Sequence, residues 1–271
     1  MITMNTGMAR KRPAPLRRSS PRKRGPRFTK APDLGLIGSE QKKQNSESSS
    51  LYRLFAWLSP AYPVGAFSYS SGLEWAVEAG DVASADTLCR WLATLLSDGA
   101  GFCDAVLFAH SYRACQARDD SALFETAELA AALPPSRERF LETTAQGRAF
   151  LDVTQATWPC PTIKRLVEIW SGPIAYPVAV AVASAGHQIP LEHSLAAYLQ
   201  AVAANWVSAG LRLVPLGQTD GQRVTAMLEP AVAATTKRAL AAALDDAGGA
   251  VFRADIAAMR HETQYTRLFR S

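Results

Sequence analysis

Apolar residues recur at helical spacing along the chain from Leu51 onward. Leu51, Leu54, Phe55 and Leu58 stand at i, i+3, i+4 and i+7, one face of a helix that Pro60 ends. Four more amphipathic runs follow, at residues 84–99, 104–118, 121–133 and 136–157. Strand-sized runs of β-branched residues with hairpin turns are absent from the sequence. The pattern therefore predicts an all-α fold.

Two later segments are apolar almost throughout. Residues 169–186 carry no formal charge, and residues 194–211 are interrupted by Gln200, Asn205 and Ser208. A membrane-spanning helix needs about 20 strongly apolar residues, whereas these segments are rich in Ala and Val. We therefore predict that both form buried core helices of a single-domain helical bundle over residues 51–271, and we expect no membrane partner.

The positive charge of the chain is concentrated near its start. The 271 residues are 48% hydrophobic and include 29 Lys and Arg against 24 Asp and Glu. Residues 1–50 hold 12 of the basic residues and only Asp33, Glu40 and Glu47 as acids, so they carry +9 and the remainder carries −4. We predict that residues 1–50 are a disordered basic extension, because they have almost no apolar periodicity.

The role of this extension stays open. It could be dispensable, it could be a targeting segment, or it could be an arm that touches phosphate or a membrane surface. A nucleic-acid-binding protein normally carries its positive charge on the folded body, and here the body is mildly acidic. We therefore expect no nucleic-acid partner.

Signatures of catalysis are missing from the sequence. It has no G-x-x-x-x-G-K-[ST] loop for a nucleotide, no G-x-S-x-G elbow for a serine nucleophile and no H-E-x-x-H zinc motif. Cys89, Cys103, Cys115 and Cys160 are too far apart for a zinc knuckle, and we expect each to be a small buried apolar residue. The sequence predicts a protein that is not an enzyme, with no catalytic residue and no metal ligand.

One alternative assigns a metal site to the middle of the chain. His187 and His193 are six residues apart, and Glu192 precedes the second histidine. As three ligands they would make the chain an independent metal-dependent hydrolase, although helical ligand pairs prefer a spacing of three or four. Otherwise the two histidines have surface or helix-capping roles.

Two segments carry more aromatic residues and arginines than a helical bundle needs. In residues 59–74, two prolines and Gly65 predict a rigid turn. Residues 259–271 combine arginines with aromatic residues at helical spacing. Such residues are enriched at interfaces, so we predict that both segments bind partners; the alternatives are a capping loop and a final helix docked on the core. The predicted contact residues are Tyr62, Phe67, Tyr69, Glu74, Arg260, Tyr265, Leu268, Phe269 and Arg270.

A third candidate contact lies at residues 217–223. Gly217, Asp220 and Gly221 predict a sharp break in the chain there, because glycine tolerates strained backbone angles. We assign Gln218 and Asp220 to partner binding. The alternative is a plain corner between two buried helices.

Four blocks of the sequence resemble the UreF family of urease accessory proteins. In order, the blocks read PVGAFSYS followed by GLE, then GHQIPL, then NWVSAGLRLVPLGQTDGQ, and finally RHETQY through the closing RS. They lie in the family's order and span about Leu51 to Ser271. Residues 1–50 depart from the pattern, which agrees with an extension.

The resemblance implies a protein that assembles others. Members of this family are all-helical homodimers that join UreD, also called UreH, to the GTPase UreG and dock on apo-urease to help load nickel. The resemblance also implies control of GTP hydrolysis by UreG, a cytoplasmic location, and nickel handled by the complex without a tightly bound cofactor here. In that family the C-terminal tail packs against UreD, which implies the same role for Arg260, Tyr265, Leu268, Phe269 and Arg270.

Overall fold

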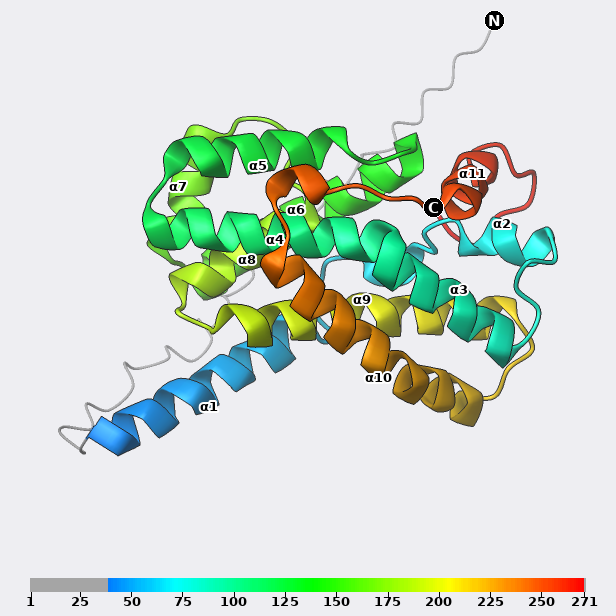
Figure 1. Cartoon of the computed structure of the whole chain (residues 1–271), viewed down its shortest axis with the longest axis horizontal. Helices are drawn as coiled ribbons and strands as arrows, with labels where there is room; N and C mark the ends of the chain where they lie inside the picture. The colour runs from blue at the N-terminus through cyan, green and yellow to red at the C-terminus, as the bar shows by residue number, and fades with distance from the viewer. Residues whose placement is uncertain (1–38, 271) are drawn as a thin grey trace, which may run out of the picture. The chain divides into compact units, whose positions relative to one another are not determined.

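The computed structural model describes residues 39–270, with side chains from Glu47 onward. The described residues form helices and connecting turns without any strand, so the all-α prediction is confirmed (Figure 1). In chain order the elements are α1 (Ser39–Trp57), η1 (Ala66–Ser68), α2 (Leu73–Glu78), α3 (Ala85–Asp98), α4 (Ala100–Ala117), α5 (Asp120–Ala132), α6 (Arg137–Thr157), α7 (Pro161–Ile169), α8 (Tyr176–Gly186), α9 (Leu191–Leu213), α10 (Gln218–Ala241), η2 (Leu244–Asp246) and α11 (Phe252–His261).

Several helices begin where the sequence provides a cap. The side chains of Ser84, Asp119 and Ser136 accept hydrogen bonds from backbone N–H groups in the first turns of α3, α5 and α6. Pro161 opens α7, where its missing N–H costs nothing. These starts confirm the amphipathic runs predicted at residues 84–99, 121–133 and 136–157.

Two predicted boundaries were wrong. The body was expected to begin at Leu51, but α1 already begins at Ser39. Residues 39–50 contain no Gly or Pro, and their Glu, Gln and Lys residues favour helix, so the apolar first helix extends backward. The core helix expected over residues 169–186 starts only at Tyr176, because Gly172 and Pro173 hold the preceding residues in a loop. The disorder predicted for residues 1–38 lies outside the described residues.

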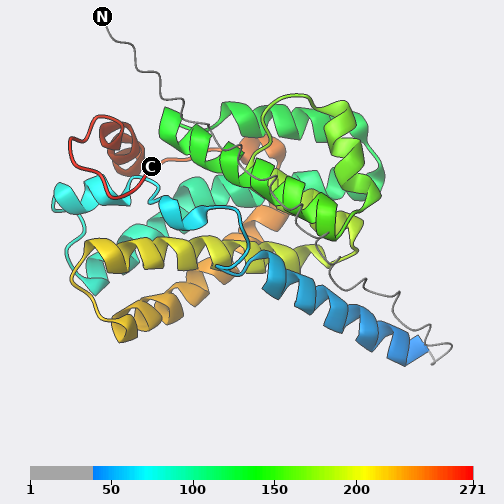
Figure 2. The ribbon, with the colours of Figure 1, turned by 180° about the vertical axis from the view of Figure 1, so that it is seen from behind.

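The core is built around α8. Every residue from Tyr176 to Ala185 is buried, and α8 packs against α4, α6, α7 and α9. Figure 1 and Figure 2 show α9 and α10 side by side next to this centre, with α4 and α5 on another side of it. Small residues allow the close approach: a Cβ on Gly147 of α6 would lie 2.1 Å from the carbonyl oxygen of Ile174.

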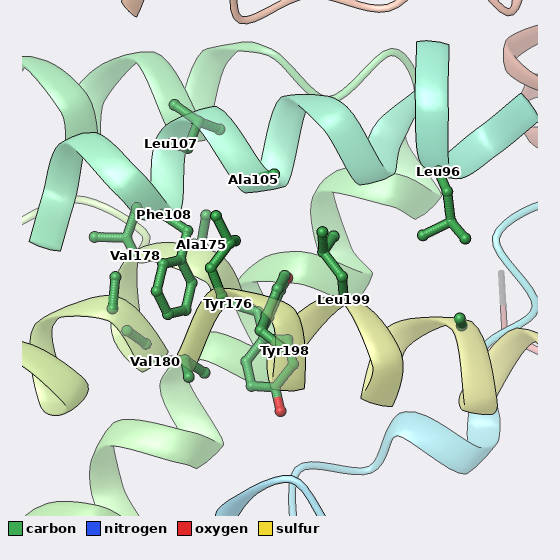
Figure 3. Packing of buried hydrophobic residues seen from close by; sticks show 14 of the residues in the cluster. Leu96, Ala105, Leu107, Phe108, Ala175, Tyr176, Val178, Val180, Tyr198 and Leu199 are labelled. Carbon is green, nitrogen blue, oxygen red and sulfur yellow. The ribbon is translucent and has the colours of Figure 1, made fainter. Parts of the chain in front are cut away.

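Aromatic rings fill the space that the small residues leave. Phe108 of α4, Tyr176 of α8 and Tyr198 of α9 meet in the middle of the bundle (Figure 3). The centroid of the Tyr198 ring lies 5.4 Å from each of the other two. Such pairs stabilise a core beyond their buried area, so these three rings join α4, α8 and α9.

Within residues 39–270, one helical stretch is long and apolar enough to pass a length-and-composition test for a membrane span. It runs from Ala85 to Ala117 and combines α3 with α4. Gly99 interrupts it, and more than half of its most apolar window is buried inside the protein. A core helix passes the same test, so this stretch is only weak support for a membrane span.

Candidate functional site

The two aromatic, arginine-rich segments of the sequence lie against each other. The backbone N–H groups of Leu268 and Phe269 donate to the Glu74 carboxylate over 2.6 and 2.9 Å, and the N–H of Arg270 donates to the carbonyl of Ser68 over 2.8 Å. Figure 1 and Figure 2 both place the C-terminus beside α2 and α11. Glu74 therefore holds the end of the chain against the 65–74 loop.

The loop presents Glu74 through two left-handed residues in a row. Ser71 has φ +56° and Gly72 has φ +80°, and α2 starts directly after them. A Cβ on Gly72 would lie 2.7 Å from the backbone nitrogen of Ala258, so only glycine lets α2 approach α11 this closely. This close approach brings the first turn of α2 under the C-terminal segment.

A buried charged cluster lies under that segment. His261 is fully buried, with Nε2 3.0 Å from Glu74 Oε2 and Nδ1 2.6 Å from Glu138 Oε2. These two contacts hold the imidazole ring between the two acidic side chains and fix its orientation. Arg267 donates to the other oxygen of Glu138 over 2.7 Å. Glu74, Glu138 and His261 are buried, whereas Arg267 is exposed and joins Glu138 to the C-terminal segment.

Above this cluster, Arg212 joins the two segments at the surface. Its guanidinium carbon lies 3.7 Å from the ring centroid of Phe67 and 4.2 Å from that of Phe269, and its Nη1 donates to the carbonyl of Phe67 over 2.8 Å. An arginine between two rings gains cation–π attraction from both. Phe67 and Phe269 are thereby fixed relative to each other.

The outer side of this arrangement is apolar and exposed. Phe67 and Leu268 are each 65% exposed, and Tyr265 is fully exposed. Arg270, also exposed, completes the patch. We call Phe67, Arg212, Tyr265, Leu268 and Arg270 the tail surface. Large apolar side chains flanked by arginine and held on a fixed backbone have the character of a protein-binding surface.

The structure places the predicted contact residues in three different settings. Phe67, Tyr265, Leu268 and Arg270 belong to the tail surface, and Arg260 is exposed at the last turn of α11. Glu74, Tyr69 and Phe269 are buried just beneath it, so in this conformation they support the tail surface from below. Burial and the charge of Glu142 raise the pKa of Tyr69, while Arg270 nearby opposes both. Their part in partner binding stays a prediction.

Tyr62, Gln218 and Asp220 lie elsewhere. The buried Tyr62 hydroxyl is 2.8 Å from Thr154 Oγ1, and its ring packs on Phe150 and Trp158. Asp220 caps α10 by accepting from the N–H of Gly217 over 3.1 Å, and Gln218 is exposed beside it. The corner between α9 and α10 lies at residues 214–217, whereas Asp220 and Gly221, where a break was predicted, already belong to the first turn of α10. The contact of this segment with a partner stays a prediction.

The alternative that the last residues of the chain form a helix docked on the core was wrong. A final helix was considered for the last residues, but α11 ends at His261 and residues 262–270 cross the loop without forming a helix. Glu74 and Ser68 accept the backbone N–H groups that a helix would pair internally, so the segment is held by the loop.

The residues that sequence reasoning missed are Glu138, Arg212 and, as a binding group, His261. Glu138 stands in the first turn of α6, where an acid is expected to stabilise the helix N-terminus in any protein. His261 lies 123 residues from Glu138 and 187 from Glu74 along the chain. No local pattern indicates such distant partners, although Arg212 and His261 both fall inside the blocks that resemble the UreF family.

A cavity of about 560 Å³ opens between the 58–67 loop, α6 and α9. Asp104, Arg139 and Glu142 are its charged lining residues. Arg139 pairs with Glu142, and Tyr198 donates to Asp104 over 2.7 Å. Burial raises the pKa of Asp104 to about 6, against the opposing effects of Arg139 and Tyr198. These groups are paired with one another, which leaves the cavity without an evident reacting centre.

Among residues 47–270 there is no group of three or more His, Cys, Asp or Glu side chains placed to hold a metal ion. His187 caps the end of α8, and its Nε2 donates to the carbonyl of Trp158 over 2.9 Å. Glu192 and His193 are exposed in the first turn of α9. The hydrolase alternative therefore receives no support.

Because the pKa of Asp104 is raised in the folded protein, we expect the free energy of unfolding to depend on pH. Between about pH 4 and pH 6 the Asp104 carboxyl is ionised in the unfolded chain but still protonated in the folded protein. The free energy of unfolding therefore falls as the pH rises through this range. Asp104→Asn keeps an acceptor for Tyr198 and removes that loss. In urea titrations, the stability of the variant relative to the wild type should rise by about 1–3 kcal/mol between pH 4 and pH 6.5. The exposed Asp152→Asn should show no such change, and an equal difference at all pH values would contradict the role of Asp104.

Comparison with known proteins shows that the chain is similar to urease accessory proteins. A family model described as UreF matches residues 82–229. A urease accessory protein UreF of Rhodopseudomonas palustris strain HaA2 is 63% identical over 225 residues, which are 83% of this chain and 95% of that protein. A second, from strain BisB18, is 62% identical over 83% of this chain and 94% of its own length. A third, from Bradyrhizobium diazoefficiens, is 59% identical over 83% and 93%.

Proposed function

Because the chain belongs to the UreF family of urease accessory proteins, we propose that it acts without catalysis of its own, as an adaptor between other proteins. In this proposal its partners are UreD, the GTPase UreG and apo-urease. It acts as a homodimer in the cytoplasm and regulates GTP hydrolysis by UreG. Nickel is the cargo of the complex, delivered to urease, and is not a cofactor of this chain.

The tail surface is the observation that carries the proposal. It gathers exposed apolar residues from two segments that are about 200 residues apart in the sequence. Beneath it, the buried side chains of Glu74, Glu138 and His261 contact one another, and the exposed Arg267 pairs with Glu138. Burying ionisable side chains is costly unless they are paired, and here each one contacts a residue from a distant part of the chain. The cluster is accounted for if its role is to hold the C-terminal segment in one conformation for a partner.

We assign UreD to the tail surface, because binding of UreD by the C-terminal segment is what the family resemblance implies. The α9–α10 corner, with exposed Gln218, is proposed as a separate contact for UreG or urease. A rigid, pre-formed surface loses little conformational entropy on binding, which favours tight association. An adaptor built in this way presents two faces to two proteins.

The function is tested in cells that carry the urease genes but lack this one. Such cells should make urease protein with little activity, and restoring the chain with an affinity tag should restore activity and co-purify UreD and UreG. Cells that also lack the gene for UreD provide the control, since restoring the chain alone should not rescue them. Normal urease activity in the absence of this chain would exclude the proposal.

A further inference from the structure

The cavity between the 58–67 loop, α6 and α9, which we call the α6–α9 cavity, has the size and lining of a small-molecule site. Figure 2 shows the loop running between these two helices. The volume of about 560 Å³ lies within the range of roughly 300–1,000 Å³ that is usual for ligand sites. Most of the lining side chains are apolar or aromatic, and the aromatic ones are Tyr62, Phe67, Tyr176, Tyr198 and Trp206. Such walls suit a ligand with an apolar body.

Two buried polar side chains line this cavity without a hydrogen bond of their own. Gln146 of α6 is 6% exposed and Tyr176 of α8 is 9% exposed. Within residues 47–270, neither the Gln146 amide nor the Tyr176 hydroxyl has a hydrogen-bond partner. Buried polar groups are normally hydrogen-bonded, so these two groups are left for a molecule inside the cavity.

One carboxylate of the lining also has an oxygen left for a ligand. Asp104 Oδ2 accepts from the Tyr198 hydroxyl over 2.7 Å, whereas Oδ1 has no hydrogen-bond partner in the described part of the chain. Arg139 is held elsewhere, because it pairs with Glu142 and its Nη1 donates to Ser71 Oγ over 2.7 Å. The lining thus holds two carboxylates and one guanidinium, which leaves one negative charge in excess.

This excess charge is present at neutral pH. Burial raises the pKa of Asp104 only to about 6, so its carboxyl is ionised at neutral pH. The neighbouring Cys103, like Cys115 and Cys160, is only partly buried, contrary to the prediction from the sequence. Burial and the charge of Asp104 raise the pKa of the Cys103 thiol to about 12, so this thiol stays neutral. The cavity therefore attracts a positively charged group.

We propose that the α6–α9 cavity binds a small organic cation, an amine with an aromatic or alkyl body. The ammonium group donates to Asp104 Oδ1, and the body lies among the rings of Tyr62, Tyr176 and Trp206. The faces of aromatic rings also attract ammonium ions. The Gln146 amide and the Tyr176 hydroxyl supply the further hydrogen bonds that fix the orientation of the ligand.

Water is the alternative occupant of the cavity. Water molecules can satisfy Gln146, Tyr176 and Asp104 individually. The volume of 560 Å³, however, is roughly 20 times the share of one water molecule in the liquid, and each buried water needs several polar partners. Aromatic and aliphatic walls provide few such partners, which favours an organic ligand.

The test compares three molecules of similar shape on the purified chain, so its outcome does not depend on the adaptor function proposed above. Phenethylamine is the cation, 2-phenylethanol is the neutral control and phenylacetate is the anionic control. At about 10 mM and about pH 7.5, phenethylamine should raise the melting temperature by about 4 °C, and each control by less than about 1 °C. Equal shifts with all three molecules, or no shift with phenethylamine, would overturn the proposal.

Two variants locate the binding, with dissociation constants measured by isothermal titration calorimetry. Asp104→Asn keeps an acceptor for Tyr198 and removes the charge, so it should weaken binding of phenethylamine at least about 10-fold. Tyr176→Phe keeps the ring and removes the unpaired hydroxyl, so it should weaken binding about 3-fold. Asp152→Asn, an exposed change on α6, should have no effect.

Tyr176→Phe alone is used if circular dichroism shows that Asp104→Asn folds poorly. Wild-type affinity in the variants that fold would show that the amine binds outside the cavity, and the proposal would be wrong.

Discussion

Glu74→Ala is expected to destabilise the protein by about 3 kcal/mol and to release its C-terminal segment. The substitution removes the acceptor of two backbone N–H groups, those of Leu268 and Phe269, and one of the two carboxylates that face His261. Leaving a buried donor without its acceptor costs about 1–3 kcal/mol, and the N–H groups of Leu268 and Phe269 both lose theirs. We take a sum of about 3 kcal/mol because water can reach the site once the segment has left.

This loss should lower the melting temperature by roughly 6–12 °C, at 2–4 °C per kcal/mol for a domain of this size. Hydrogen exchange should locate the change, with the amides of Leu268 and Phe269 exchanging much faster than in the wild type. Glu78→Ala is the matched control, since Glu78 is exposed on the same short helix and should leave both measurements unchanged. Slow exchange at Leu268 and Phe269 in Glu74→Ala would show that Glu74 does not hold the segment.

The segments that form the site could be predicted from the sequence, but the orientation of their residues could not. The aromatic content of residues 59–74 and 259–271 was visible in the sequence, and the structure brings both segments together. The sequence did not show which of these residues face outward. Their orientation depends on the contact between His261 and Glu138, which are 123 residues apart in the chain. Glu74 was predicted as a partner contact, and the structure shows it buried beneath the tail surface, so its contact with a partner stays a prediction.

Helices were more accessible to prediction than the site. Ser84 and Ser136 stand at the starts of two predicted runs and cap α3 and α6, while the cap of α5, Asp119, lies two residues before the predicted start. The first helix was harder, because the polar residues 39–50 bear no apolar pattern and yet continue α1. Helix caps and apolar periodicity are local, so they predict the helices from the sequence. Contacts such as that of Arg212 with Phe67 join residues 145 positions apart and form only in the folded chain.

The second prediction concerns the outer face of the tail surface. Tyr265→Ala combined with Leu268→Asp should weaken binding of UreD by about 100-fold, which corresponds to about 2.7 kcal/mol. Tyr265 is fully exposed and Leu268 is 65% exposed, so neither contributes much to the folded chain alone. Truncating a tyrosine at an interface hot spot costs about 2 kcal/mol, and an aspartate in place of Leu268 adds the cost of desolvating its charge.

This double variant tests the tail surface more specifically than removal of residues 260–271 would. The truncation also deletes His261, leaves Glu74 and Glu138 without their shared partner, and would weaken binding for structural reasons alone. The double variant keeps the cluster, the backbone hydrogen bonds and the Arg212 contacts. Its circular dichroism spectrum and melting temperature should match those of the wild type.

The dissociation constant of UreD for the purified chain is the measurement that tests the central claim most directly. It is determined at one salt concentration for the wild type, for the Tyr265→Ala, Leu268→Asp variant and for Met227→Ala, which alters an exposed apolar residue of α10. We predict tight binding by the wild type and by Met227→Ala, and binding about 100-fold weaker by the double variant. Equal dissociation constants for all three proteins, or no binding of UreD by the wild type, would contradict the tail surface as the site through which this protein works.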